Sequence, residues 1–143
     1  MSLIRALDHV NIRTADLAAT KAFLTDVLGL AEGWRPPFPF PGAWLYAGDK
    51  DVVHLVEVDR PAADSAGSSL DHFAFDIADY DDVLARVERT GLKFRATTTP
   101  GTSVKQIFVR DPNGVTIELN WKGDRPRGRA ESPQADSPDV PGG

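Results

Sequence analysis

Two stretches of this chain share one order of hydrophobic and polar positions. The sequence LDHVNIRTAD begins at Leu7 and LDHFAFDIAD begins at Leu70, and five of the ten aligned positions are identical. Each stretch opens with the alternation typical of a half-buried strand and then changes to the spacing of an amphipathic helix. The chain is therefore predicted to contain two copies of one structural unit.

A helix is predicted after each copy of the repeat. Apolar residues recur at helical spacing at Leu17, Phe23, Leu24, Val27 and Leu28 in the first copy, and at Tyr80, Val83, Leu84 and Val87 in the second. Asp16 and Asp79 stand where helix N-caps belong. Gly29 and Gly91 stand just past the last helical turn, where glycine commonly ends a helix.

Strand patterns follow each predicted helix. They cover residues 43–47 and 52–58 in the first half, and residues 105–110 and 115–121 in the second. The last two strands flank a DPNG turn, in which proline presets one backbone angle and glycine tolerates a positive φ. Each half therefore reads β-α-β-β-β, which predicts an α+β fold with two tandem modules around a shared core.

The predicted domain does not extend to the end of the chain. We expect one folded domain over residues 1–122, with modules at about 4–60 and 68–122. Residues 123–143 carry four prolines and almost no large apolar side chain, which predicts a disordered tail. Residues 33–42, GWRPPFPFPG, form a proline- and aromatic-rich excursion that cannot be a regular helix or strand.

Charge and composition narrow the classes of partner. A net charge of -5 and a pI near 5.1 argue against nucleic-acid binding, which needs a basic face. No apolar run approaches the roughly 18 residues of a membrane span, and no secretory signal is visible, so a cytoplasmic location is expected. The chain has no cysteine, so any metal site must use imidazole and carboxylate ligands.

The repeat organises all three histidines. His9 and His72 are the third residues of the two LDH segments, while His54 and Glu118 lie in the predicted last strands of the two units. The separations are also alike, 45 residues from His9 to His54 and 46 from His72 to Glu118. A lone histidine in a strand is usually structural, but four related positions predict ligands that converge on one divalent ion. Zn, Ni, Co, Mn and Fe(II) all suit these donors.

Strand alternation supports this interpretation. His9, Asn11 and Arg13 share one face of the first strand, and Glu118 and Asn120 share one face of the last. This predicted inner face is polar where an apolar core would otherwise be expected.

The same alternation assigns other residues to structural roles. Asp8 and Asp71, which precede the ligand histidines, are expected to point away from the metal and to serve in caps or turns. Phe23 and Phe94 are predicted to lie in the hydrophobic core.

Taken together, the motifs resemble the vicinal oxygen chelate superfamily, which includes glyoxalase I, extradiol dioxygenases, and fosfomycin- and bleomycin-resistance proteins. The resemblance covers about residues 4–122 and rests on the two LDH strands, the AD-capped helix with DVLGL, and the DPNG turn leading into IELNW. It implies paired modules that form an open, U-shaped sheet around a divalent metal, usually in a homodimer.

The resemblance also implies residue roles. His9, His54, His72 and Glu118 match the four ligand positions of glyoxalase I-like members, although those enzymes usually carry Glu or Gln in place of His54. In glyoxalase I a metal carboxylate is also the proton-transfer base, so Glu118 and His54 are the expected catalytic residues. Arg13 matches the position that holds a glutathione carboxylate.

These features favour a metal-dependent lyase or isomerase acting on a small carbonyl substrate. A metal with four protein ligands keeps two open positions, which suit Lewis-acid stabilisation of an enediolate or a similar vicinal-oxygen chelate. The side chains predicted to contact the substrate are Asn11, Arg13, Trp34, Phe38, Phe40, Trp44, Tyr46 and Asn120.

Three alternatives remain at this point. An extradiol-type Fe(II) or Mn(II) dioxygenase would use His9, His72 and Glu118, although His54 as a fourth ligand would crowd it. A fosfomycin-type transferase needs a cationic pocket, for which the predicted inner face offers few cations. A metal-free binding protein of the bleomycin-resistance type would use the aromatic side chains of the proline-rich excursion and the strand that follows it.

Overall fold

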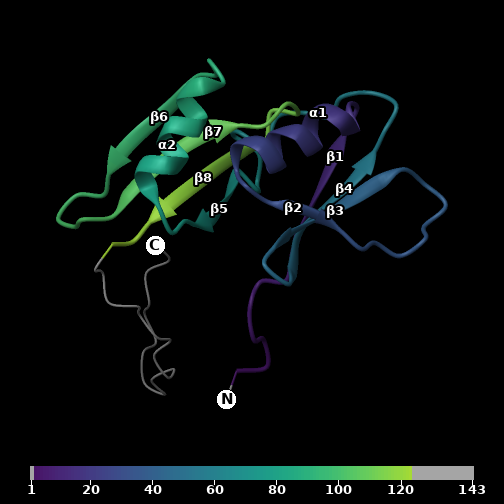
Figure 1. The fold of residues 1–143 in the computed structure, drawn as a ribbon, viewed down its shortest axis with the longest axis horizontal. Coiled ribbons are helices and arrows are strands. Elements are labelled where there is room, and N and C mark those ends of the chain that lie inside the picture. Colours follow the sequence, from purple (N-terminus) through teal and green to yellow (C-terminus); the bar gives the residue numbers. More distant parts are fainter. Residues whose placement is uncertain (1, 124–143) are drawn as a thin grey trace.

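The structure, a computed structural model, describes residues 2–123. Within this range, eight strands form two four-stranded sheets (Figure 1), with orders β1-β4-β3-β2 and β5-β8-β7-β6. The first module contains β1 (Val10–Thr14), α1 (Leu17–Ala22), the π-helical turn η1 (Phe23–Val27), β2 (Ala31–Gly33), β3 (Gly42–Ala47) and β4 (Lys50–Glu57). The second contains β5 (His72–Asp76), α2 (Tyr80–Arg89), β6 (Phe94–Thr98), β7 (Lys105–Arg110) and β8 (Thr116–Trp121). The tail predicted to be disordered lies outside the described residues, apart from Gly123.

Both sheets have the same topology. The first strand of each module pairs in parallel with the last, and the remaining neighbours are antiparallel. This confirms the α+β fold and its two β-α-β-β-β modules. The sequence pattern did not locate the strand that follows each helix, and the structure identifies these strands as β2 and β6.

The aspartates at the two helix starts are N-caps, as predicted. Oδ1 of Asp16 accepts a hydrogen bond from the Ala19 amide and Oδ1 of Asp79 accepts one from the Asp82 amide, each 3.0 Å long. These bonds satisfy amides that have no partner within the helix. The first helix differs from a regular one because it continues into η1, where the Leu28 amide bonds to the carbonyl of Phe23 five residues back.

The DPNG turn connects the two modules. Oδ1 of Asp111 accepts hydrogen bonds from the amides of Asn113 and Val115, and Gly114 takes a φ of 80°. The Asn113 side-chain amide then donates to Oγ1 of Thr20 in α1, at 3.0 Å. Thr20 is fully buried and also bonds to Thr14 of β1, so the second module's turn is fixed to the core of the first.

One hydrophobic core serves both sheets. Its buried members come from η1 and α2 and from the helix-facing sides of the strands: Ile12, Phe23, Leu24, Ala43, Leu45, Val53, Leu55, Val87, Ile107, Val109, Ile117 and Leu119. Strand alternation places the neighbours of these residues on the opposite face of each sheet. The candidate site residues of both modules therefore lie on the faces turned away from the shared core.

Phe23 lies in this core as predicted, but Phe94 does not. Phe94 begins β6, the outer strand of its sheet, and is 37% exposed. An outer strand has a neighbour on one side alone, which explains why this side chain lacks the cover that its apolar character predicts. No helix in the described part of the chain is long and apolar enough to cross a membrane.

Candidate metal centre

The second module brings two predicted ligands together on neighbouring strands. His72 begins β5 and Glu118 lies in β8, which pairs with β5 in parallel. Nε2 of His72 lies 3.7 Å from Oε2 of Glu118. Because Glu118 alternates with the core residues Ile117 and Leu119, its carboxylate projects from the polar face, where its side chain is 11% exposed.

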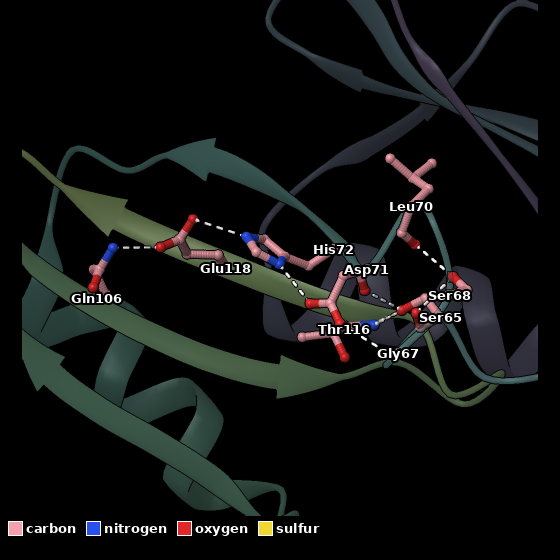
Figure 2. A network of polar contacts seen from close by, with 9 residues as sticks. All are labelled: Ser65, Gly67, Ser68, Leu70, Asp71, His72, Gln106, Thr116 and Glu118. Carbon is pink, nitrogen blue, oxygen red and sulfur yellow. Dashed lines mark hydrogen bonds and ion pairs between the residues drawn. The ribbon is translucent and has the colours of Figure 1, made fainter. Parts of the chain in front are cut away.

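Hydrogen bonds hold both of these side chains in place (Figure 2). Nδ1 of His72 bonds to Oδ2 of Asp71 at 2.8 Å, and the amide side chain of Gln106 donates to Oε1 of Glu118. The bond from the Gly67 amide, followed by the one from His72, lowers the pKa of Asp71. Nε2 of His72 and Oε2 of Glu118, which face one another, are then the atoms available to bind a metal. A histidine whose second nitrogen is held by a carboxylate is the usual arrangement at protein metal sites.

The first module repeats the aspartate–histidine pair. His9 immediately precedes β1, and its Nδ1 bonds to Oδ2 of Asp8 at 2.5 Å. This leaves Nε2 as the free nitrogen, as in His72. Asp71 has the turn role predicted for it, since its Oδ1 accepts a hydrogen bond from the Gly67 amide. The prediction that Asp8 and Asp71 point away from the histidines is wrong, because each carboxylate also bonds to the ring of the next residue. Recurrence of the dipeptide Asp-His in both repeats was the signal for this role.

His54 is held differently. Its ring lies between those of His9 and Trp44, at centroid distances of 3.7 and 3.9 Å and interplanar angles of 17° and 5°. Its Nε2 donates to Oδ2 of Asp51 at 2.6 Å, and this bond is the main reason that the pKa of Asp51 is lowered.

This stacking bears on whether His54 and His9 fit one ion. Imidazole nitrogens bind metals in the plane of the ring, at roughly 2.1 Å. Two nearly parallel rings 3.7 Å apart have no common point in their planes at that distance. His9 keeps its Nε2 without a carboxylate partner, whereas Nε2 of His54 is bonded to Asp51. The arrangement of His54 does not support its predicted role as the fourth ligand.

The two pairs do not form one group within the chain. Among residues 2–123, no three His, Asp or Glu side chains lie close enough to hold a metal ion. The physical reason is the shared core, because each pair lies on the face of its own sheet that is turned away from that core. The structure therefore shows two half-sites where the sequence predicted one four-residue constellation.

The predicted substrate-contacting residues fall into three places. Asn11 and Arg13 line a cavity of about 650 Å³ beside β1, and Asn11 also lines the neighbouring cavity near His54. Near His54, the stack continues into an aromatic group with a small cavity of about 160 Å³, which Phe38, Phe40 and Trp44 line. Trp34 is exposed at the edge of this group, and Tyr46 donates its hydroxyl to the carbonyl of Trp34.

Asn120 lies in the second module, on the same face as Glu118. Its buried Oδ1 has no hydrogen-bond partner in the described residues. A buried amide oxygen without a partner is costly and is commonly satisfied by a ligand or a water. Asn120 is thus on the second sheet, whereas the other predicted contacts belong to the first module.

Comparison with known proteins agrees with this fold. A lactoylglutathione lyase of Salmonella typhimurium is 27% identical over 84% of the chain and 95% of its own length. The glutathione transferase FosA of Serratia marcescens is 26% identical over 82% of each. A glyoxylase/bleomycin resistance protein/dioxygenase domain from Frankia sp. superposes with a TM-score of 0.70 at 19% identity, over 85% of this chain and 95% of that one. A family model matches residues 6–119, and the chain belongs to the Glyoxalase/Bleomycin resistance protein/Dioxygenase superfamily.

Proposed function

We propose that the protein is a divalent-metal-dependent enzyme that moves a proton next to a carbonyl group of a small substrate, as a glyoxalase-type lyase or isomerase does. The observation that carries this proposal is the His72–Glu118 pair, in which both side chains are oriented and one donor atom of each is free. Relatives named as a lactoylglutathione lyase and as a glutathione transferase support enzymatic activity of this general kind.

The proposed ligands are His9, His72 and Glu118. A bound divalent ion supplies Lewis acidity, which stabilises negative charge on a substrate oxygen. His54 is proposed to hold and move the proton, because the hydrogen bond to Asp51 fixes the ring and leaves Nδ1 as its second nitrogen. Glu118 is the other acid–base candidate, through the oxygen that Gln106 does not occupy.

A complete site of this kind needs a second copy of the chain. His9 and the His72–Glu118 pair lie on separate sheets, and no group of three donors forms among the described residues. We propose a homodimer in which the first-module face of one protomer meets the second-module face of its partner. Two-fold symmetry then produces two equivalent sites, because each copy supplies both kinds of face.

A second candidate is an extradiol-type dioxygenase. Without His54 among the ligands, the set His9, His72 and Glu118 is the two-histidine, one-carboxylate arrangement that Fe(II) oxygenases use. The hydrogen bond between His54 and Asp51 is the specific observation that favours this candidate. It holds His54 away from the role of fourth ligand, in which His54 would crowd the metal.

A metal titration tests the proposal. Protein stripped with a chelator is titrated with Zn, Ni, Co, Mn and Fe(II) ions, and its mass in solution is measured with and without metal. We expect about one ion per chain in a dimer, loss of binding in His72→Ala, and retained binding in the matched variant His54→Ala. A wild-type protein that binds none of these ions would overturn the proposal.

Assays on the metal-bound protein then distinguish the two reaction classes. Candidate carbonyl substrates are incubated in heavy water, and deuterium uptake at the carbon next to the carbonyl is followed. Catechols are tested in parallel for oxygen consumption. Deuterium uptake supports the lyase or isomerase, and oxygen consumption supports the dioxygenase in its place.

A further inference from the structure

A large cavity opens at one end of the second sheet, beside His72. It has a volume of about 930 Å³, and its lining includes His72, Phe94, Arg95, Phe108 and Arg110. These residues meet there because β5 begins, β7 ends and β6 begins at this end of the sheet. The cavity therefore reaches one half-site directly, without a contribution from the first module.

Positive charge dominates the ionisable groups of this cavity. Lys93, Arg95 and Arg110 line it together with two carboxylates, Asp71 and Asp111. Both carboxylates are already engaged in hydrogen bonds within the protein. Asp71 bonds to the His72 ring and the Gly67 amide, and Asp111 is buried in the DPNG turn, where it accepts bonds from that turn.

Of the three cations, Arg110 is partly engaged, with a single contact of 3.6 Å to Asp64, where both side chains are more than half exposed. Arg95 lies over the ring of Phe108 at 4.5 Å, so that its guanidinium is held against an apolar wall. A guanidinium in such a position retains its hydrogen-bond donors for an anion.

The rest of the wall is apolar. The ring of Phe108 contacts the Arg95 guanidinium, and its centroid lies 6.0 Å from that of the His72 ring, to which it is nearly perpendicular. Leu92 and Phe94 also border the cavity and remain 44% and 37% exposed, with Phe94 on the core-facing side of the sheet, opposite Phe108. Large apolar side chains exposed around polar anchor groups are typical of a surface that a ligand covers.

We propose that this cavity binds a small organic acid with an apolar body. The apolar part packs against Phe108, which lies on the same face of the sheet as Arg95, and the anionic group is bound by Arg95 and Lys93. In the enzyme, the anionic group would be the part of the substrate away from the reacting carbonyl. The inference therefore rests on the proposed function and narrows it to anionic substrates. Neither the sequence pattern nor the family resemblance pointed to Lys93 or Arg95.

Binding of three matched probes tests this inference on metal-free, full-length protein. Phenylacetate and phenylphosphonate each carry an aromatic ring and an anionic group, and benzyl alcohol carries the ring without a charge. Calorimetry or amide chemical shifts report the affinity. We expect one or both anions to bind, and the neutral alcohol to bind at least about tenfold more weakly, as loss of a charge-assisted hydrogen bond predicts. The anion that binds tighter identifies the class of acid.

Variants locate the site. Arg95→Ala should weaken binding of the preferred anion about tenfold, and Arg95→Lys should recover part of it because the charge remains. Arg86→Ala is the matched control, since it removes one positive charge from α2, on the helix side of the sheet. Binding of the alcohol as tight as the anions, or equal effects of Arg95→Ala and Arg86→Ala, would overturn the inference.

The outcome is separable from that of the metal titration. Anion binding is measured without metal, so a protein that binds no ion can still bind the acid. If metal binds and the acid does not, the inference alone fails. If the acid binds and metal does not, the metal-dependent function fails and the cavity is a binding site for organic acids.

Discussion

Asp71 bonds to Nδ1 of His72 and leaves Nε2 of the same ring facing Glu118. Asp8 and His9 form the same pair in the first module. In each case the aspartate fixes which nitrogen is free, and this relationship leads to the first prediction.

Removing the carboxylate of Asp71 should weaken metal binding without removing a ligand. Asp71→Asn is expected to lower the affinity for divalent ions by about 10- to 100-fold, as loss of a ligand-orienting carboxylate usually does. The affinity is measured by competition with a coloured chelator. Asp81→Asn, on the exposed start of α2, is the control and should match the wild type. Equal affinities for Asp71→Asn and this control would show that the pair is structural.

Asp51 should affect the reaction and leave the metal in place. Because Asp51 holds His54 by a bond of 2.6 Å, Asp51→Asn is expected to lower turnover by roughly 100-fold, the lower range for acid–base catalysis. Metal content, measured by elemental analysis, should stay that of the wild type. Asp49→Asn, two residues earlier in the exposed turn, is the matched control. Loss of metal in Asp51→Asn would instead indicate that His54 is a metal ligand.

Acid should remove the stabilising contribution of Asp71. Its pKa is lowered in the folded protein by the Gly67 amide and by His72, so its contribution is present above the ordinary value of 3.8 and is lost as the pH falls through the folded value. The difference in unfolding free energy between wild type and Asp71→Asn should therefore be full at about pH 7 and pH 5, and should shrink below about pH 3. Urea unfolding at these pH values measures it. A difference that is constant with pH would contradict the expectation.

The link between the modules can be tested through Asn113. Asn113→Ala removes the donor to the buried Thr20 hydroxyl, which should lower the free energy of unfolding by about 1–2 kcal/mol. Denaturant unfolding measures the loss. Ser68→Ala, which removes an exposed hydroxyl bonded to the nearby loop carbonyls of Ser65 and Leu70, should cost much less. Similar losses for both variants would mean that the bond to Thr20 adds nothing to the coupling of the modules.

Most of the fold could be predicted because its signals are local. Asp16 and Asp79 are N-caps, Gly29 and Gly91 take positive φ after the helices, and β7 covers the residues expected of it. These features depend on neighbours within a few positions, which a single sequence displays.

The candidate site could be predicted in part. The repeat correctly grouped His9 with His54, and His72 with Glu118, because related strands pair alike in both modules. The repeat could not show that Trp44 stacks on His54, since this contact depends on the β3–β4 register, nor that the shared core separates the two pairs. The cations of the large cavity were missed because Arg95 lies on the outer strand β6, whose position the pattern did not locate.

The two sheets have the same strand order, so the Asp8–His9 pair of the first module has a counterpart, Asp71–His72, in the second. A change at Asp8 can be repeated at Asp71 in the same molecule, with chain length, assembly and composition held constant. Comparing the two results shows how the same aspartate acts on His9, which is stacked on another ring, and on His72, which lines a cavity.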